Sequence, residues 1–478
     1  MFGSIGISIM STSPSISSAL ALHNRYIQEN TFKGEKGFIL VTSEVLLSIY
    51  WTFFIAVSIA FLSDGVEMLI RTRAFFRNES KLSEFRSGLK EKDLCDPDFT
   101  VIMPAYRNSD AVVRSVMHLL EMGFPSKQIL VVDDFSNDQY TTARETSKLG
   151  IRVISITRNS KKVGAINLGL DAVKTDYIVL LDSDSFMVSS YQRLREAMLE
   201  MQILGLDAMA GRVLPCGYSP TVESRQFPLS EKRSRLLQFQ WLEYDQAMRL
   251  GRGAMWALEK VESEFGIKYA EISSVSGAFG IFRRTALIKA LKRFEDKEES
   301  FLGEDIERTW KLLANKGYIG YSDDIIILTS APLGAVGHFK QRITWAEGLF
   351  RCVFTDFGWS LVRRKLAGAS YAASLVRDVL LQPLRILSIV LIFSNPAGFL
   401  SILLFYFIMN ILLTRKVSHD MYPSTKILLL LPFYRLYVST IPTTIGYLHA
   451  FLHLIKLYAK PKRVAPPIRI ANEWNGIE

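Results

Sequence analysis

The chain has few cysteines and lacks a basic leader. Its 478 residues include three cysteines, Cys95, Cys216 and Cys352, which lie far apart. Their number and spacing give neither a disulfide framework nor a metal-binding motif, and are typical of unpaired thiols in a reducing cytosol. Residues 1–22 carry no charge, whereas a secretory signal peptide begins with a basic region, so we expect no such signal.

Long runs of Lys and Arg interleaved with aromatic residues are also missing, which argues against nucleic acid as a partner. The net charge is nevertheless +10. An excess of positive charge attracts anionic membrane surfaces and phosphorylated ligands. We therefore expect the partners to be a lipid bilayer or a phosphorylated substrate, and no nucleic acid.

Apolar residues are abundant at both ends of the chain. Hydrophobic residues make up 49% of the sequence, and the mean hydropathy is +0.17. Residues 37–62 form an apolar run long enough to span a bilayer, and only Glu44 interrupts it. The basic residues Arg71 and Arg73 follow, so we expect the next part of the chain on the cytoplasmic side.

The C-terminal third contains a second apolar region. Residues 350–366 are amphipathic and suit a helix in the membrane interface. Residues 379–393 and 397–413 read as spans, and residues 426–458 as a long segment broken at Pro442. The length of the chain predicts two or more structural units. The expected divisions are a Ser-rich N-terminal segment (1–36), a transmembrane helix (37–62), a basic linker (63–98), a cytoplasmic α/β domain (99–348), an amphipathic interface helix (349–370), a transmembrane region with two spans and a long broken segment (371–458), and a basic tail (459–478).

Strand-like and helix-like segments alternate from residue 99 to about residue 324. This alternation predicts an α/β domain with a mainly parallel sheet and helices on both faces. Residues 220–265 read as helical, with many charges. The expected strands cover residues 100–103, 129–132, 152–156, 177–181 and 207–213.

One expected strand runs directly into two acids. Residues 177–181 are continuously apolar, as in a buried parallel strand, and Asp182 and Asp184 follow. Open α/β sheets bind ligands at the carboxyl ends of their strands. Acids on alternate residues there can hold a hard divalent cation, which can in turn hold a diphosphate. A short Asp-x-Asp also occurs at solvated strand ends, so its meaning depends on its companions.

Two earlier strand ends carry groups that suit a nucleotide. Ala105 and Tyr106 end the first strand, where a small residue lets a flat ligand approach and a ring can pack on a base. Asp133 and Asp134 end the second strand, where a carboxylate can accept hydrogen bonds from a nucleobase or ribose. Ordinary turns explain the same residues. The second acid cluster at the same sheet edge favours a functional role.

Small and basic groups occur at two further turns. Lys162 precedes a predicted helix, and cations together with free helix N–H groups favour a phosphate there. A solvated basic loop is the alternative. Gly277 lies in a tight turn before a strand, where the lack of a side chain would allow a sugar to approach closely.

Two later motifs complete the series. Glu304 and Asp305 begin a helix, where the helix dipole alone favours acids and where a general base is the competing role. Gln341 and Trp345 share one face of a helix. Trp345 beside a bilayer suits an interfacial anchor, and its indole could instead stack on a sugar ring.

In this order, the motifs resemble those of the membrane-embedded processive family 2 glycosyltransferases, which include hyaluronan, chitin, cellulose and poly-N-acetylglucosamine synthases. The resemblance covers roughly residues 99–351, with membrane segments on both sides. It implies a GT-A glycosyltransferase domain at residues 99–348, on the cytoplasmic side of a multi-pass protein of the cell membrane. It also implies a metal-dependent, inverting hexosyltransferase that moves a sugar from a UDP-sugar to a growing polysaccharide and exports the product.

The resemblance implies roles for the donor site. Asp133 or Asp134 would contact the uridine, with Ala105 and Tyr106 nearby. Lys162 would lie near the donor phosphates or sugar. The Asp182–Asp184 pair would hold Mg²⁺ or Mn²⁺, with Asp184 as the main ligand and Asp182 on the nucleotide sugar.

The resemblance also implies roles at the acceptor side. Asp305, next to Glu304, would be the general base. Trp345 would stack on the acceptor sugar, with Gln341 and Gly277 close to it. Gln341 and Arg342 would border the diphosphate, and the C-terminal membrane helices would form a product channel.

One position departs from the family pattern. The family carries Arg immediately before its Trp, where it contacts the diphosphate, and this chain has Thr344 there. Arg342 would point about 200° away on a helix, and Arg351 is another candidate cation.

Two alternative functions share these motifs. A single sugar transfer to a polyprenyl-phosphate lipid needs the same acids without a channel. A membrane scaffold with a degenerate transferase domain is the other, and the retained acids Asp182, Asp184 and Asp305 argue against it.

Overall fold

The structure is a computed structural model that divides into two compact units, Met1–Ile59 and Ala60–Glu478. Helix α2 (Ser43–Leu89) begins in the first unit, and all later elements belong to the second. The described residues are 43–89, 96–136, 141–216, 234–262, 264–293, 302–376, 382, 395–421, 423–458 and 470–475.

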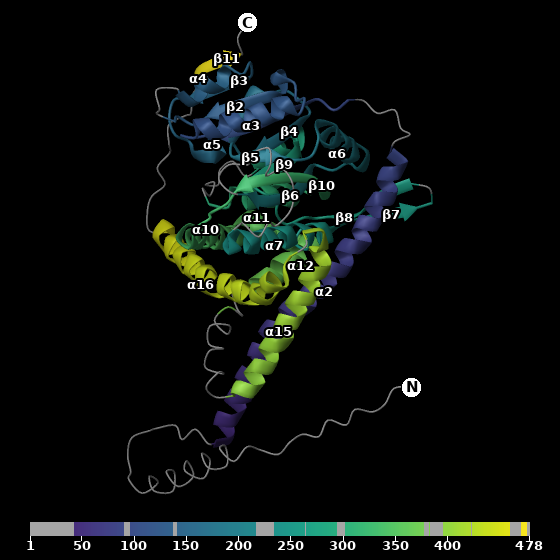
Figure 1. The fold of residues 1–478 in the computed structure, drawn as a ribbon, viewed down its shortest axis with the longest axis vertical. Coiled ribbons are helices and arrows are strands. Elements are labelled where there is room, and N and C mark those ends of the chain that lie inside the picture. Colours follow the sequence, from purple (N-terminus) through teal and green to yellow (C-terminus); the bar gives the residue numbers. More distant parts are fainter. Residues whose placement is uncertain are drawn as a thin grey trace. The chain divides into compact units, whose positions relative to one another are not determined.

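A nine-stranded mixed sheet forms the centre of the second unit, in the order β11-β3-β2-β1-β4-β9-β6-β10-β5 (Figure 1). Strands β3, β2, β1 and β4 are parallel, and β6 is parallel to β10, whereas β9 runs antiparallel between β4 and β6. The expected α/β class is confirmed, with a reversed strand inserted into the sheet. The strands are β1 (Phe99–Ala105), β2 (Ile129–Asp133), β3 (Arg152–Ile156), β4 (Tyr177–Leu181), β5 (Ser185–Met187), β6 (Ala208–Cys216), β9 (Phe279–Arg283), β10 (Ile319–Ser330) and β11 (Ile470–Asn475).

Helices cover the sheet and bury its strands. Every residue of β2 and of β4 is buried, which explains why both strands are continuously apolar. Because β1 to β4 are parallel, their carboxyl ends lie at one edge, and Ala105 pairs with Asp133 there. The covering helices are α3 (Ser109–Glu121), α4 (Thr141–Ser147), α5 (Lys161–Ala172), α6 (Tyr191–Leu204), α7 (Arg235–Arg249), α8 (Arg284–Arg293) and α9 (Glu304–Ala314).

Helix α2 continues through most of the segment expected to be a linker at residues 63–98. Phe75, Leu82 and Phe85 on this helix belong to the main hydrophobic core. Arg86 Nε donates a hydrogen bond to Glu200 at 3.0 Å. The segment is therefore a packed helix that contributes to the core of the second unit.

The expected interface helix at residues 349–370 is divided into shorter pieces. Helix α10 (Ala335–Val353) ends within it, and α11 (Asp356–Ser360) and α12 (Leu366–Ser374) follow. The hydroxyl of Thr355 accepts a hydrogen bond from the Gly358 N–H at 3.1 Å, and so caps α11 and separates it from α10.

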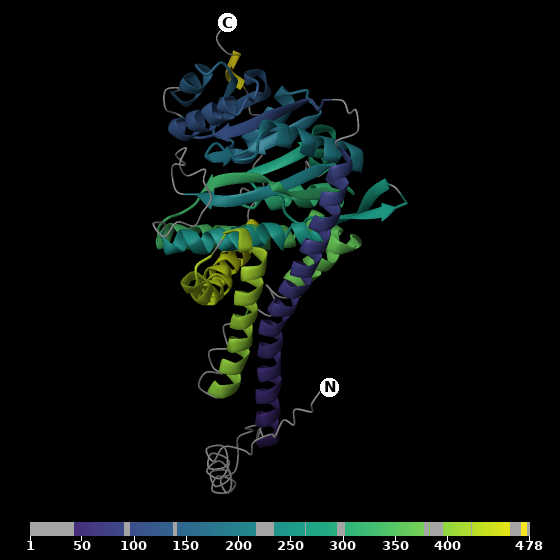
Figure 2. The ribbon, with the colours of Figure 1, turned by 45° about the vertical axis from the view of Figure 1, so that its right-hand side comes forward.

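Three described helices are long and apolar enough to cross a membrane, over Leu47–Gly88, Pro396–Val417 and Thr425–Ile455. The second is α15 and the third lies in α16 (Thr425–Tyr458), which contacts both α10 and α7 (Figure 2). Apart from residue 382, the span expected at residues 379–393 lies outside the described residues.

Helix α16 continues through the break expected at Pro442. Proline lacks the N–H that would bond to the carbonyl of Val438, one turn earlier. The hydroxyl of Thr443 donates to that carbonyl at 2.8 Å instead. A side chain thus replaces the missing backbone hydrogen bond, which lets the helix continue.

Candidate active site

Four segments that are distant in sequence meet at the ammonium group of Lys162. Helix α5 begins at Lys161, whose φ of 62° lies in the left-handed region. The Lys162 Nζ lies 2.6 Å from Asp182 Oδ1 and 3.3 Å from Glu304 Oε1. It also donates a hydrogen bond to the Gly277 carbonyl at 2.9 Å. The structure therefore joins the start of α5, the end of β4, the turn before β9 and the start of α9.

The neighbouring carboxylates of Glu304 and Asp305 have different environments. Asp305 Oδ2 accepts a hydrogen bond from the Gly277 N–H at 3.0 Å. Burial raises the pKa of Asp305, and the adjacent Glu304 charge raises it further. Burial also acts on Glu304, but the cations of Lys162 and Arg308 outweigh it and lower the pKa of Glu304. The pair combines an ionised acid with an acid of raised proton affinity, the property that a general base needs.

The two acids that follow β4 differ in their partners. Lys162 pairs with Asp182, yet burial is the stronger influence and raises the pKa of Asp182. Burial also raises the pKa of Asp184. No ion pair involves Asp184 within the part of the chain that the structure describes. Asp184 is therefore the carboxylate at this strand end that is available to an added cation.

The acids that follow β2 are held by hydroxyl groups. Asp133 Oδ2 accepts a hydrogen bond from the Ser155 hydroxyl at 2.8 Å. Asp134 Oδ1 accepts one from the Ser160 N–H at 2.6 Å, and its own N–H donates to the Ala105 carbonyl at 2.8 Å. Both side chains are buried, at 2% and 3% exposure. These acids therefore tie the end of β2 to β3 and to the loop that precedes α5.

Tyr106 has a different character from the buried acids that follow β2. It directly follows β1, and 45% of its surface is exposed. The guanidinium of Arg107 lies 5.3 Å from the centre of its ring. The ring is thus an open aromatic surface next to the acids that follow β2.

Arg342 on α10 is buried in a polar cluster. Its Nη2 lies 2.7 Å from Glu243 Oε2, and its Nε donates to His338 Nε2 at 3.0 Å. The Tyr434 hydroxyl donates to the same Glu243 oxygen at 2.5 Å. Arg342 is only 4% exposed. This side chain, expected at the diphosphate, is instead paired with an acid from helix α7.

The aromatic cluster around Arg342 borders the acids after β4. The Arg342 guanidinium carbon lies 4.4 Å from the centre of the Trp345 ring, which is 46% exposed. Tyr244 packs against Trp345 at 5.6 Å between ring centres. The side chain of Gln341 forms a hydrogen bond with Tyr244. Burial raises the pKa of Tyr244, and the Asp184 charge contributes to the rise. Trp345 therefore presents an open ring close to the Asp-x-Asp strand end.

Thr344 and the other candidate cation, Arg351, both bond to groups on their own helix, α10. The Thr344 hydroxyl donates to the Lys340 carbonyl one turn earlier, at 3.0 Å. Arg351 forms an ion pair with Glu347 on its own helix. Both candidate replacement cations, Arg342 and Arg351, therefore have acidic partners within the protein.

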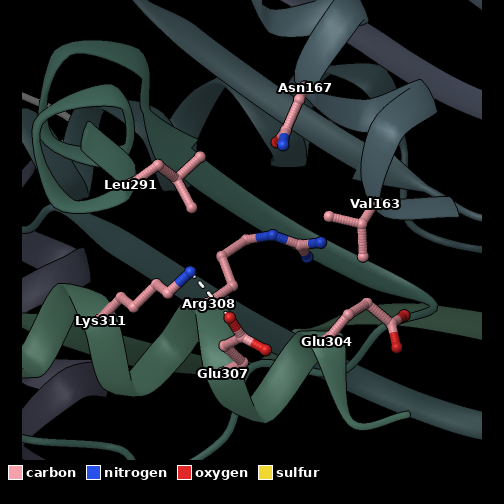
Figure 3. A pocket seen from close by; sticks show the side chains of 7 residues that line it. All are labelled: Val163, Asn167, Leu291, Glu304, Glu307, Arg308 and Lys311. Carbon is pink, nitrogen blue, oxygen red and sulfur yellow. Dashed lines mark ion pairs between the residues drawn. The ribbon is translucent and has the colours of Figure 1, made fainter. Parts of the chain in front are cut away.

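Glu304, which pairs with Lys162, also lines a small pocket (Figure 3). Arg308, one turn after Glu304 on α9, extends into it. Sequence reasoning missed this residue, although its position four residues after an acid on a predicted helix was a usable signal. The pocket is lined by Val163, Asn167, Leu291, Glu304, Glu307, Arg308 and Lys311.

Sequence comparisons identify similar proteins for this part of the chain. A family model described as "Glycosyl transferase family 2" matches residues 100–289. A poly-beta-1,6-N-acetyl-D-glucosamine synthase of Staphylococcus epidermidis is 23% identical over 274 residues, which is 55% of this chain and 57% of that protein. A protein of the same name from Staphylococcus aureus is 23% identical over 290 residues, 57% of this chain and 61% of its own length. The chain thus spans about three fifths of these curated relatives.

Solved structures with a similar arrangement include a mannosyltransferase from Pyrobaculum calidifontis in complex with GDP-Man and Mn²⁺. It is 15% identical, with a TM-score of 0.46 that covers 85% of this chain and 100% of the other. Staphylococcus aureus TarS in complex with UDP-GlcNAc is 17% identical, with a TM-score of 0.36 over 80% of this chain and 99% of the other.

Proposed function

We propose that this chain, whose residues 100–289 form a glycosyltransferase family 2 domain, is an inverting enzyme that elongates a polysaccharide from a nucleotide-sugar donor. One observation carries the proposal. The Lys162 ammonium group links the acid after β4 to the first acid of α9, beside the turn at Gly277. The curated relatives are named as synthases of an N-acetylglucosamine polymer, so UDP-N-acetylglucosamine is the first donor to test.

The donor would lie along the carboxyl ends of β1, β2 and β4. Tyr106 offers its exposed ring to the base, and Ala105 leaves room beside it. Asp133 and Asp134 would face the uridine and shape the loop around it. Lys162 would lie near the donor phosphates or sugar, where its positive charge offsets the charge of the departing diphosphate.

Asp305 would act as the general base. It would take the proton from the acceptor hydroxyl while that oxygen forms its bond to the anomeric carbon and the bond to the diphosphate breaks. A single displacement of this kind inverts the configuration at that carbon. The hydrogen bond from the Gly277 N–H orients the Asp305 carboxylate, and Glu304 holds Lys162 in place.

The strand end after β4 fits a divalent cation such as Mg²⁺ or Mn²⁺. Asp184 has a half-buried carboxylate whose pKa is raised by burial although the Lys162 charge opposes the rise, and carboxylate oxygens suit these hard ions. Asp184 would hold the cation, with Asp182 beside it. Among the described residues no group of three or more His, Cys, Asp or Glu is placed to hold a metal, so donor phosphate oxygens would complete the ligands. When bound, the cation stabilises the leaving diphosphate.

The acceptor would approach from the side of α10. Trp345 exposes a ring on which a sugar can stack, and Gln341 supports the cluster through Tyr244. Gly277 has no side chain, and a Cβ there would lie 3.3 Å from both Lys162 Nζ and Glu304 Oε1. The turn therefore allows a sugar to reach the catalytic acids.

The three apolar helices would anchor the enzyme in the cell membrane as a multi-pass protein, with the transferase domain on the cytoplasmic side. The length and composition of these helices support the anchoring. The basic residues Arg71 and Arg73 support the orientation.

The proposal is tested by incubating the purified full chain in detergent with a panel of UDP- and GDP-sugars. Release of the nucleoside diphosphate and the mass of the product are measured together. We expect one UDP-sugar to be consumed and a long polymer to form. A lipid carrying one sugar would instead indicate transfer to a polyprenyl phosphate, and no turnover with any donor would indicate a scaffold.

A further inference from the structure

The pocket between α5 and α9 contains a buried cation, Arg308, whose N–H donors have no acceptor among the described residues. Arg308 is 6% exposed, and its guanidinium reaches across the pocket toward Val163, below Asn167 (Figure 3). Within the described ranges, this guanidinium makes no hydrogen bond and no ion pair. Its side chain lies over the ring of Phe282, 6.0 Å from the ring centre.

The other charged groups of the pocket already have partners. Lys311 pairs with Glu307 at 2.7 Å, and both side chains are buried. Glu304 pairs with Lys162 at 3.3 Å, and its carboxylate points away from Arg308 (Figure 3). Glu304 supplies a nearby negative charge, but buried N–H donors without acceptors are still costly, because they have lost the hydrogen bonds that water gave them. An anion that entered the pocket would remove this cost.

We propose that Arg308 binds an oxyanion on the sugar side of the donor, either its second phosphate or a carboxylate carried by the sugar. This inference rests on the proposed function. Glu304 both lines the pocket and pairs with Lys162, so a group bound at Arg308 would be adjacent to the catalytic acids. Guanidinium groups bind phosphate and carboxylate alike through paired hydrogen bonds.

The assignment also explains the departure at Thr344. The family Arg is absent there, and Arg342 and Arg351 are paired with Glu243 and Glu347. Arg308 is a buried cation that is still open to a ligand, on the helix that begins with Glu304.

The test measures the dissociation constants of four probes for the full chain in detergent by isothermal titration calorimetry. The probes are UMP, UDP, UDP-glucose and UDP-glucuronate. The variants are Arg308→Gln and Arg308→Lys. The matched control is Lys316→Gln, which removes an exposed positive charge just beyond the end of the same helix.

We expect Arg308→Gln to weaken the binding of selected probes by about tenfold to a hundredfold, which is the effect of losing one charge-assisted hydrogen bond. Weaker binding of UDP and both UDP-sugars, with the binding of UMP unchanged, assigns the second phosphate as the ligand of Arg308. Weaker binding of UDP-glucuronate alone assigns a sugar carboxylate as the ligand. Arg308→Lys should recover part of the loss, and Lys316→Gln should match the wild type.

A melting curve separates binding from folding. Arg308→Gln should melt close to the wild type, because the Arg308 guanidinium makes no hydrogen bond or ion pair with the described residues that the variant would lose. Unchanged affinity for all four probes, or an equal loss for all four, overturns the proposal. If the wild-type chain binds none of the probes, the proposed function fails and this inference fails with it.

Discussion

Gly303 and Gly348 pack backbone against backbone. A Cβ on Gly348 would lie 2.8 Å from the Gly303 nitrogen, and a Cβ on Gly303 would lie 3.0 Å from the Gly348 carbonyl carbon. Gly303 has a φ of 81° and directly precedes Glu304 and Asp305. The helix that carries Trp345 thus packs directly against the loop that positions the two proposed catalytic acids.

Gly348→Ala should reduce turnover by about tenfold to a hundredfold, because the new methyl group must displace the loop and a shift of about 1 Å at a catalytic group has such an effect. Initial rates of diphosphate release measure it. Gly334→Ala, at the residue just before the same helix, is the control, since a Cβ there meets nothing within 4 Å. Equal rates for the two variants would mean that the contact does not position the acids.

Asp305→Asn should bind donor normally and lose transfer by about 10²–10⁴-fold, the usual contribution of a general base. The amide oxygen can still accept the hydrogen bond from Gly277, so the turn should stay in place. Donor affinity and single-turnover rates measure the two effects separately. Polymer formation at the wild-type rate would remove Asp305 from the mechanism.

The pH dependence of turnover should report the raised pKa of Asp305. Burial and the Glu304 charge raise this pKa, while Lys162 and Arg252 oppose the rise. Because the base works only when deprotonated, activity should fall with decreasing pH at a value above the usual 3.8. Glu304→Gln removes the neighbouring negative charge, which lowers the pKa of Asp305 and should move the acidic limb to lower pH. An acidic limb that stays at the same pH, or moves to higher pH, in this variant would show that the Glu304 charge does not raise the pKa of Asp305.

Chelation should abolish activity, and added Mn²⁺ or Mg²⁺ should restore it. Asp184→Asn should raise the metal concentration needed for half-maximal rate by roughly tenfold or more, since it removes a charged oxygen ligand. Asp176→Asn is a matched control, because this acid precedes the same strand at its opposite end. Full activity in the presence of chelator would exclude a metal from the reaction.

Arg249→Met should lower the free energy of unfolding by about 3–5 kcal/mol, the range for breaking a buried ion pair from one side. Arg249 pairs with Asp323 and Asp420, both at 2.8 Å, and links α7 and β10 to the segment that follows α15. Thermal melting in detergent measures the change, with the exposed Arg363→Met as control. A melting point equal to that of the control would show that the network adds little stability.

The parallel half of the sheet was predictable because its strands are local apolar runs. Strands β3 and β4 have the bounds expected from sequence, and β1 and β2 differ by one or two residues. The glycosyltransferase family 2 assignment, made from the order of the motifs, is confirmed by the family match over residues 100–289.

The hairpin of β7 (Trp256–Val261) and β8 (Glu264–Ala270) was not predictable in the same way, and the helical expectation there was wrong. Distant parts of the chain hold it. Phe265 packs against Phe85 of α2 at 5.7 Å, and Lys81 donates to the Leu258 carbonyl at 3.4 Å. Contacts across about 180 residues leave no periodic signal in the segment itself.

The convergence of the acids followed from topology, since parallel strands end at one edge. The partners of the cations did not follow from topology. The partner of Arg342 is Glu243, which lies on another helix 99 residues earlier, and no local pattern pairs them. The absence of an ion pair between Arg308 and any described acid likewise depends on the direction in which the Glu304 carboxylate turns.

Strand β11 pairs antiparallel with β3, and Arg152 and Glu473 form an ion pair across them at 2.6 Å (Figure 1). An uncovered sheet edge offers free N–H and C=O groups to strands of other molecules, and so promotes aggregation. In this protein the chain itself occupies that edge. A shortened form without residues 470–475 would expose the edge of β3 and favour self-association.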